Sequence, residues 1–228
     1  MNTRLVITML VAALVVIIIL ALVFIGPFQG TAQNATPTSI AEVRSFQGQD
    51  LSSINDFREN AINGVQHVNI STYQLTVTGL TNRTVTYSYN QVLTQFPHYD
   101  KVETLHCVEG WDVTILWEGV RVRDLLNDAG IDPRANTIVF TATDGYTTSF
   151  PLTYFTQQDI LMAYRVNNVT LPADRGFPFQ LVAQNKWGYK WIKWIDQIQL
   201  TDDPTYQGYW EQRGYSESGD LNQSFYSV

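Results

Sequence analysis

The chain has 228 residues, of which 14 are Lys or Arg and 21 are Asp or Glu, and its formal net charge is -7 at pH 7. Because nucleic-acid binding depends on a basic surface, this acidic and lightly charged composition excludes a nucleic-acid-binding protein. Hydrophobic residues make up 45% of the sequence and aromatic residues 13%. These values exclude a disordered chain and indicate a packed globular domain.

Residues 5–25 (LVITMLVAALVVIIILALVFI) form an apolar run without a charged residue. A helix of this length spans a hydrocarbon core of about 30 Å, and the run is longer than the apolar part of a cleaved signal, roughly 7–15 residues. We therefore predict a single-pass transmembrane anchor over residues 1–25. Arg4 precedes the run. The positive-inside tendency then places the N-terminus in the cytoplasm and the following domain on the extracytoplasmic side of the cell membrane.

The residues after the apolar run predict a tether followed by one exported domain. Residues 26–45 begin with a polar stretch rich in Gly, Pro, Ser and Thr, which is typical of a linker. Residues 46–228 are long enough for one sizeable core. Sequons of the form N-x-[ST] are consistent with export, although chance also produces them in a chain rich in Asn and Thr; they begin at Asn34, Asn69, Asn82, Asn168 and Asn222.

Within this domain, short runs of alternating apolar and polar residues predict more strands than helices. Strands are expected over residues 73–78, 84–89, 101–108, 113–117, 137–142, 146–150, 160–166, 179–183 and 191–200. Helices are expected over residues 90–96, 120–129 and 152–158, and a short helix with coil over the tail 206–228. Because no βαβαβ rhythm occurs, we predict a single α+β domain that is mostly β.

Cys107 is the single cysteine of the chain, so it is a buried small hydrophobe, a nucleophile or a metal ligand. Pairing with His106 is disfavoured because adjacent side chains on a strand point to opposite faces. His67 and His98 have no surroundings that mark a catalytic base, so a thiol hydrolase has little support. The Glu109 carboxylate would also raise the pKa of the thiol if it lies close.

A zinc site is not indicated either, because the histidines lack any ligand spacing relative to Cys107. A soft metal needs only one protein thiolate when a cofactor supplies its other ligands. Several motifs follow in order: CVEGW at 107–111, WEGV at 117–120, the strand and Asp-Gly-Tyr turn at 137–146, QDILMAY at 158–164, LPADRGFPFQLV at 171–182 and GYKWIKWI at 188–195.

Over residues 50–215 this series resembles the molybdopterin-binding oxidoreductase domain of the sulfite oxidase fold family, and especially its methionine sulfoxide reductase branch. The resemblance implies a mixed, mostly-β fold of the sulfite oxidase type. It also implies a molybdenum centre carried by one molybdopterin, with tungsten as the alternative metal because it takes the same ligands. Cys107 would be the metal ligand, and Glu109 a proton donor or a group beside the metal ligand.

The resemblance further implies that polar side chains and backbone amides hold the pterin and its phosphate. The matching positions are Arg58, Asn60, Arg175, Gln180, Gly188, Tyr189, Lys190 and Lys193. Arg175 stands where the family has His or Asn, and Gln180 where it has Arg, so the charge is conserved if Arg175 reaches the phosphate; otherwise Arg175 is an exposed loop residue. On a predicted strand Lys190 and Lys193 face opposite sides, so one of them is expected to be solvated.

The residues after Cys107 also bear on the reaction. The sulfite oxidase branch continues with small and basic residues, whereas VEGWD adds negative charge, which is unfavourable for the sulfite anion. We therefore expect oxygen-atom transfer on a small-molecule S-oxide or N-oxide. Sulfite oxidation on the same fold and a cofactor-free extracytoplasmic binding module are the alternatives. Because the chain has no haem-attachment or iron–sulfur cysteine motif, we expect a membrane haem or quinone-linked partner to supply electrons.

Overall fold

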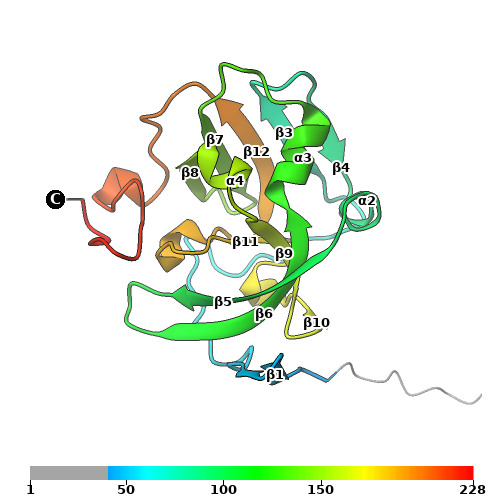
Figure 1. Cartoon of the computed structure of the whole chain (residues 1–228), viewed down its shortest axis with the longest axis vertical. Coiled ribbons are helices and arrows are strands. Elements are labelled where there is room, and N and C mark those ends of the chain that lie inside the picture. The colour runs from blue at the N-terminus through cyan, green and yellow to red at the C-terminus, as the bar shows by residue number, and fades with distance from the viewer. Residues whose placement is uncertain (1–40, 228) are drawn as a thin grey trace, which may run out of the picture. The chain divides into compact units, whose positions relative to one another are not determined.

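Two five-stranded sheets carry the fold in the computed structural model, which describes residues 41–227 (Figure 1). The first sheet contains, in spatial order, β4 (Val85–Tyr87), β3 (Leu75–Gly79), β12 (Ile195–Thr201), β7 (Thr137–Ala142) and β8 (Thr147–Pro151). The second contains β10 (Val169–Thr170), β9 (Leu161–Val166), β6 (Asp112–Arg121) and β5 (Tyr99–His106), and β11 (Gln180–Val182) also pairs with β9. A separate two-stranded sheet consists of β1 (Ser45–Phe46) and β2 (Gln49–Asp50).

The chain passes repeatedly between the two large sheets. It leaves the first sheet after β4, returns for β7 and β8, leaves again for β9 to β11, and returns as β12. Within these sheets the strand pairs are antiparallel except β12 and β3, which are parallel. A parallel pair needs a long crossover, and here the whole second sheet lies within that crossover.

Short helices cover the ends of strands. They are α2 (Tyr89–Gln95), α3 (Val122–Ala129) and α4 (Thr153–Thr156), with 3-10 turns η1 (Ala173–Arg175), η2 (Gly188–Lys190) and η3 (Glu211–Arg213). A capping box begins α2: the Gln91 N–H donates to Ser88 Oγ (3.3 Å), and the Ser88 N–H donates to Gln91 Oε1 (2.8 Å). Gly130, at φ 75°, ends α3 as predicted.

The observed elements confirm the α+β, mostly-β prediction, and β7 has the predicted bounds. Three local expectations are wrong. β5 ends at His106, so Cys107 follows the strand; residues 120–121 extend β6 instead of opening a helix. Residues 191–194 do not belong to a strand, because Trp194 has φ 54°, which interrupts extended backbone, and β12 begins only at Ile195. The two-residue strands were not predicted because they are too short to show alternation.

The predicted transmembrane anchor over residues 1–25 lies outside the described residues, as does most of the linker. Among residues 41–227, no helix has the length and apolar character needed to cross a membrane.

Gly119 provides a test of the fold, because β6 and β9 approach closely at this residue beside a register shift. A Cβ on Gly119 would lie 2.4 Å from the Met162 carbonyl oxygen and 2.8 Å from the Ala163 Cα. Both are backbone atoms of a central strand, so the strands would have to separate. We expect Gly119→Ala to lower the free energy of unfolding by about 3 kcal/mol in urea titrations.

The control is Gly48→Ala, because Gly48 has φ +82° but a Cβ added there would have no atom within 4 Å. Its expected loss is about 1 kcal/mol, from backbone strain alone. Equal losses in the two variants would contradict the close β6–β9 approach.

Candidate active site

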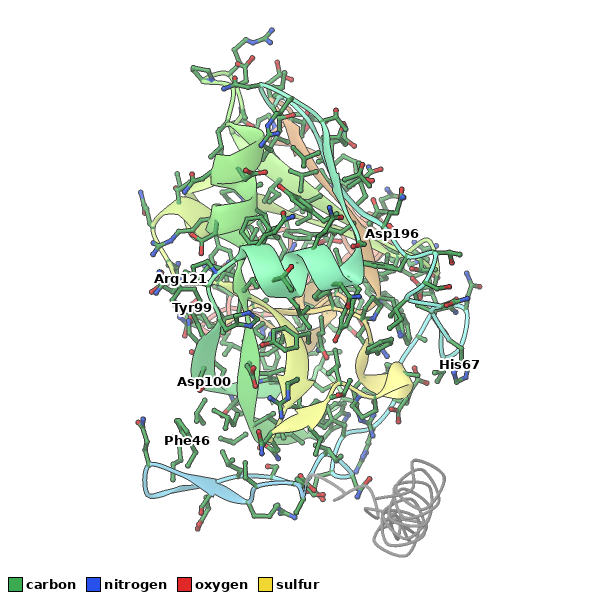
Figure 2. All side chains as sticks on the ribbon, turned by 90° about the vertical axis from the view of Figure 1, so that its right-hand side faces the viewer. Phe46, His67, Tyr99, Asp100, Arg121 and Asp196 are labelled. Atoms are coloured by element: carbon green, nitrogen blue, oxygen red, sulfur yellow. The ribbon has the colours of Figure 1, made fainter. Side chains whose placement is uncertain are left out.

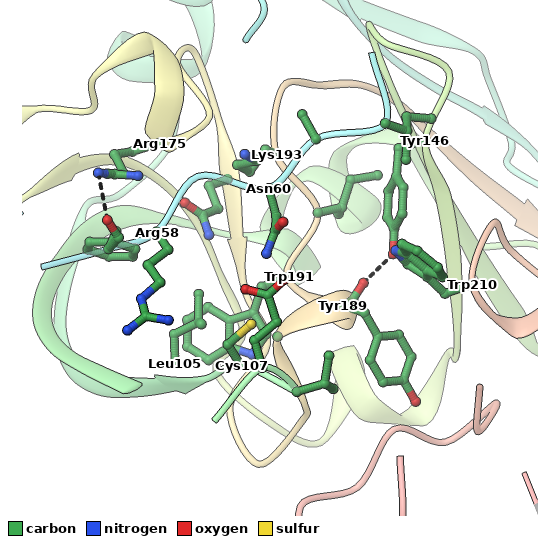
Figure 3. Close-up of a pocket in the computed structure, with 18 of the residues that line it drawn as sticks. Arg58, Asn60, Leu105, Cys107, Tyr146, Arg175, Tyr189, Trp191, Lys193 and Trp210 are labelled. Carbon is green, nitrogen blue, oxygen red and sulfur yellow. Dashed lines mark hydrogen bonds between the residues drawn. The ribbon is translucent and has the colours of Figure 1, made fainter. Parts of the chain in front are cut away.

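A cavity of about 290 Å³ lies beside Cys107 (Figure 3). Its volume is close to the lower end of the range for small-molecule sites, about 300–1,000 Å³. Its walls come from residues 57, 58, 60–62, 105, 107–109, 111, 144, 146, 174, 175, 180, 188, 189, 191–194, 210 and 215. Every residue that the sequence predicted as a site residue lines it, except Lys190.

Cys107 begins the turn that joins β5 to β6. The last strand pair is His106 with Asp112. The Cys107 N–H then donates to the Trp111 carbonyl oxygen (2.9 Å), and the Gly110 N–H donates to the Cys107 carbonyl oxygen (3.1 Å). Gly110 has φ +83°, a conformation that favours glycine. The turn therefore holds the buried Cys107 side chain, which is 8% exposed, in the cavity wall.

Burial raises the pKa of the Cys107 thiol, and the nearby Glu109 carboxylate raises that pKa further. The backbone N–H of Glu109 and the Arg58 guanidinium act in the opposite direction but do not overcome burial. The predicted repulsion from Glu109 is therefore confirmed, although burial is the larger cause. A thiol that stays protonated near neutral pH is a poor nucleophile.

The histidines do not provide a base for this thiol. All three lie among the described residues, and none lines the cavity. His67 is exposed at the surface, on the side of Asp196 (Figure 2). His98 is held by the Tyr164 hydroxyl and, through Nε2, by the Leu93 carbonyl oxygen (2.7 Å). The thiol hydrolase alternative therefore has no support.

Gly188 and Tyr189 lie in η2, directly against the Cys107 turn. A Cβ on Gly188 would lie 3.1 Å from the His106 carbonyl oxygen and 3.3 Å from the Cys107 Cα, so a glycine permits this approach. The Tyr189 hydroxyl donates to the Ser216 carbonyl oxygen (2.6 Å), and the Tyr189 carbonyl oxygen accepts a hydrogen bond from the Tyr146 hydroxyl. Both residues are therefore positioned by backbone contacts.

Gln180, the first residue of β11, has a side chain that is buried without a partner. The residue is 3% exposed and lines the cavity. Its Oε1 atom has no hydrogen-bond partner within residues 41–227. Because buried polar atoms are nearly always hydrogen-bonded, this amide is suited to a polar ligand in the cavity.

The basic side chains of the cavity differ in how many of their hydrogen-bond donors already bind protein atoms. Arg175 is buried, and its guanidinium donates to the carbonyl oxygens of Ile54 and Phe57 (both 3.2 Å). It is therefore not an exposed loop arginine, and burial lowers its pKa. Lys193 Nζ lies 3.1 Å from Glu59 Oε1, and burial lowers the Lys193 pKa.

Arg58 and Asn60 have free polar ends. Both residues are exposed, and neither side chain makes a hydrogen bond or ion pair with another residue of the described region. In Figure 3 they extend from their loop into the cavity on the side of Cys107. They therefore remain available to a ligand.

Lys190 lies outside the cavity, which corrects the expectation that it lines the site. Its side chain is fully buried, and Nζ contacts Ser149, Glu211 and Glu217. The expectation that Lys190 or Lys193 is solvated is also wrong. Residues 188–190 form a 3-10 turn, so strand alternation does not apply to them.

Sequence reasoning missed several cavity residues, namely Asp144, Tyr146, Trp210 and Tyr215. The Asp-Gly-Tyr sequence predicts a turn, but its spacing carries no chemical signal. The last two residues come from the C-terminal part of the chain, where no periodicity points to the cavity.

A metal at Cys107 would need ligands from elsewhere. Among residues 41–227 there is no group of three or more His, Cys, Asp or Glu side chains that could hold a metal ion. One thiolate suffices only when a cofactor completes the coordination.

Residues 62–210 match the family model described as the oxidoreductase molybdopterin binding domain. The chain belongs to this family. It is an oxidoreductase domain of the sulfite oxidase fold, near the methionine sulfoxide reductase branch. This membership argues against a cofactor-free binding module.

Comparisons with individual proteins show how much sequence and fold the chain shares with them. The chain is 35% identical over 156 residues to the uncharacterized oxidoreductase YuiH of Bacillus subtilis, covering 67% of this chain and 78% of that protein. It is 28% identical over 200 residues to the protein-methionine-sulfoxide reductase catalytic subunit MsrP of Gluconobacter oxydans, covering 78% and 61%. The sulfane dehydrogenase SoxCD of Paracoccus pantotrophus shares the fold, with a TM-score of 0.63, 20% identity, and coverage of 70% of this chain and 44% of that chain.

The cavity fits a molybdopterin on three observations. Cys107 offers a soft sulfur donor, because a bound metal deprotonates the thiol that ligates it. Gln180 offers an unpartnered buried amide. Arg58 offers a free guanidinium that suits a phosphate.

Arg175 is predicted to hold residues 54–57 in place. Arg175→Met keeps an apolar stem but removes the hydrogen bonds to the Ile54 and Phe57 carbonyl oxygens. We expect it to lower the free energy of unfolding by about 1.5–3 kcal/mol and to speed amide hydrogen exchange in residues 54–60. Arg58→Met is the control, with an expected change within about 0.5 kcal/mol. Unchanged exchange in Arg175→Met would refute this role.

Proposed function

We propose that this chain is a molybdenum enzyme that removes the oxygen atom from a neutral S-oxide or N-oxide. The position of the Cys107 thiol carries the proposal, because it lies in a cavity that fits a molybdopterin and beside the Glu109 carboxylate. For a sulfoxide the sulfur–oxygen bond breaks, two electrons arrive from an external donor, and two protons convert the oxygen to water. The relative named as a methionine sulfoxide reductase subunit supports this direction.

Residues of the chain would hold one molybdopterin with its metal. Cys107 would bind the metal, with molybdenum as the proposed ion and tungsten as the alternative. The remaining contacts would come from Arg58, Asn60, Arg175, Gln180, Gly188, Tyr189 and Lys193. When bound, the cofactor supplies a centre that exchanges an oxygen atom and two electrons.

Glu109 is suited to supplying a proton and to discriminating between substrates. Trp111 Nε1 donates to Glu109 Oε2 (3.2 Å), which orients the exposed carboxylate at the cavity. A carboxyl group there can deliver a proton to the leaving oxygen. Its negative charge also opposes the approach of anions, whereas a neutral S-oxide or N-oxide meets no such repulsion.

Sulfite oxidation is the second candidate, and Arg58 is the observation that favours it. Its exposed guanidinium lines the cavity and has no ion-pair partner among residues 41–227. A free guanidinium can bind an oxyanion. The two functions differ in whether Arg58 binds the cofactor or the substrate.

We also infer that residues 5–25 anchor the domain to the cell membrane, with the catalytic part extracytoplasmic. The uncharged apolar run supports the anchor. A membrane haem or quinone-linked protein would then supply the two electrons, because the chain has one cysteine and no motif for a second redox centre. The relative named as a catalytic subunit is consistent with such a partner.

The proposal predicts the substrate preference of purified, cofactor-loaded protein. Dimethyl sulfoxide and trimethylamine N-oxide would be tested with reduced benzyl viologen as donor, and sulfite with ferricyanide as acceptor. We expect kcat/KM for at least one oxide to exceed that for sulfite by about 10-fold or more, because Glu109 repels the anion. Faster sulfite oxidation would overturn the proposal.

Glu109→Gln is the matched variant in the same assay, since it keeps the shape and removes the proton and the charge. We expect it to lower kcat for the oxide by about 100-fold. Asp112→Asn is the control, because Asp112 is exposed in β6 and does not line the cavity. Equal effects of the two substitutions would argue against a role for Glu109.

A further inference from the structure

The chain continues beyond η2 and β12 and returns to the cavity with its last residues, drawn in red on the side of β8 in Figure 1. We call residues 211–223 the C-terminal clasp. It lies against residues 185–190, which contain η2. The contacts are Trp187 N–H to Gly219 O (2.8 Å), Leu221 N–H to Asn185 O (3.1 Å), Trp187 Nε1 to Gln223 O (3.1 Å), Lys186 Nζ to Ser218 O (2.8 Å) and Asp220 Oδ1 (2.5 Å), and Tyr189 hydroxyl to Ser216 O (2.6 Å).

Lys190 is the centre of these contacts. Its ammonium donates to the Ser149 carbonyl oxygen in β8 (2.7 Å), to Glu211 Oε1 in η3 (2.6 Å) and to the Glu217 carbonyl oxygen (2.9 Å). An ammonium has three donors. All of them are used by protein atoms from three separate segments, so Lys190 has none left for a cofactor phosphate.

The ion pair of Lys190 and Glu211 is completely enclosed, with both side chains at 0% exposure. Glu211 Oε1 also accepts a hydrogen bond from Thr148 Oγ1 (2.9 Å). The clasp backbone packs directly on the lysine stem, since a Cβ on Gly219 would lie 2.5 Å from Lys190 Cγ. Removing one partner would leave an uncompensated buried charge, which is strongly unfavourable.

The same clasp reaches the cavity. Tyr215 lines it, and the Tyr215 ring packs edge-on against the Tyr189 ring at 5.1 Å between centroids. Gly188 and Tyr189, which precede Lys190 directly, form the wall beside Cys107. The match to the family model ends at residue 210, so the acid of this ion pair lies beyond the matched region.

We propose that Lys190 and Glu211 are positioning residues, whose buried ion pair fixes the C-terminal clasp on η2 and so keeps Gly188 and Tyr189 in place around the cofactor. The inference rests on the proposed function, because it assumes that the cavity holds a molybdopterin. The three directed hydrogen bonds of Lys190 set the geometry of η2, which an apolar contact of equal volume would not do.

The test measures the rate at which molybdopterin leaves the loaded protein, from the fluorescence of the released and oxidised pterin. Amide hydrogen exchange in residues 185–190 and 211–223 is followed in the same samples. We expect Glu211→Gln to release the pterin about 10-fold faster than the wild type and to speed exchange in both segments.

Glu118→Gln is the matched control for general destabilisation. It breaks the half-buried ion pair of Glu118 with Arg165 (2.9 Å), which does not line the cavity, so the release rate should stay unchanged. The double variant Lys190→Met/Glu211→Leu separates lost positioning from lost stability, because an apolar pair can replace a buried ion pair without loss of stability. We expect it to regain the wild-type Tm while still releasing the pterin faster.

The outcomes separate the two proposals. A wild-type protein that binds no molybdopterin in a cofactor-competent host would overturn the proposed function, and this inference with it. If the cofactor-loaded wild type and Glu211→Gln release the pterin at the same rate, only the positioning role would be overturned. The positioning role would also be overturned if the pterin release rate rises in every variant in proportion to the loss in Tm. A purely structural ion pair requires that correlation.

Discussion

The hydrogen bond from the Cys107 N–H to the Trp111 carbonyl oxygen closes the turn between β5 and β6 and thereby places the thiol in the cavity. The long antiparallel pairing of these strands makes the base of the turn rigid, and Gly110 supplies the left-handed residue that the tight reversal requires. Gly188 then lies against the Cys107 backbone because it has no side chain. The site is therefore built first by backbone geometry, and the polar side chains are arranged around a fixed thiol.

The path of the chain explains why residues far apart in sequence meet at this thiol. The β5–β6 and β7–β8 turns line the cavity together with the connection from β11 to β12. The parallel pairing of β12 with β3 requires a long crossover, and here this crossover contains the second sheet. The basic side chains around the cavity are of two kinds. Arg175 and Lys190 are mainly occupied by protein oxygens and support the walls, whereas Arg58 is exposed and has no partner among residues 41–227. The charge available to ligands is thus much smaller than the number of basic residues near the site suggests.

The sequence predicted those parts of the fold and site that depend on local pattern. The run at 137–142 is β-rich and bounded by a turn, so β7 was predicted with its bounds, and the motifs identified Cys107, Gln180 and Gly188. Lys190 could not be understood in this way, because its partner Glu211 is 21 residues distant and belongs to a tail without periodicity. Residues 191–194 read as a strand because they are aromatic and apolar, and only the positive φ of Trp194, set by tertiary packing, interrupts it.

The proposed chemistry depends on Cys107 being a metal ligand in a cavity that otherwise lacks a protein metal site within residues 41–227. X-ray absorption at the molybdenum edge tests this directly when cofactor-loaded wild type is compared with Cys107→Ser, a substitution that keeps the size of the side chain. If Cys107 binds the metal, the wild-type spectrum will require one more sulfur ligand than the variant spectrum. The same number of sulfur ligands in both proteins, or neither molybdenum nor tungsten in the wild type, would contradict this role of Cys107.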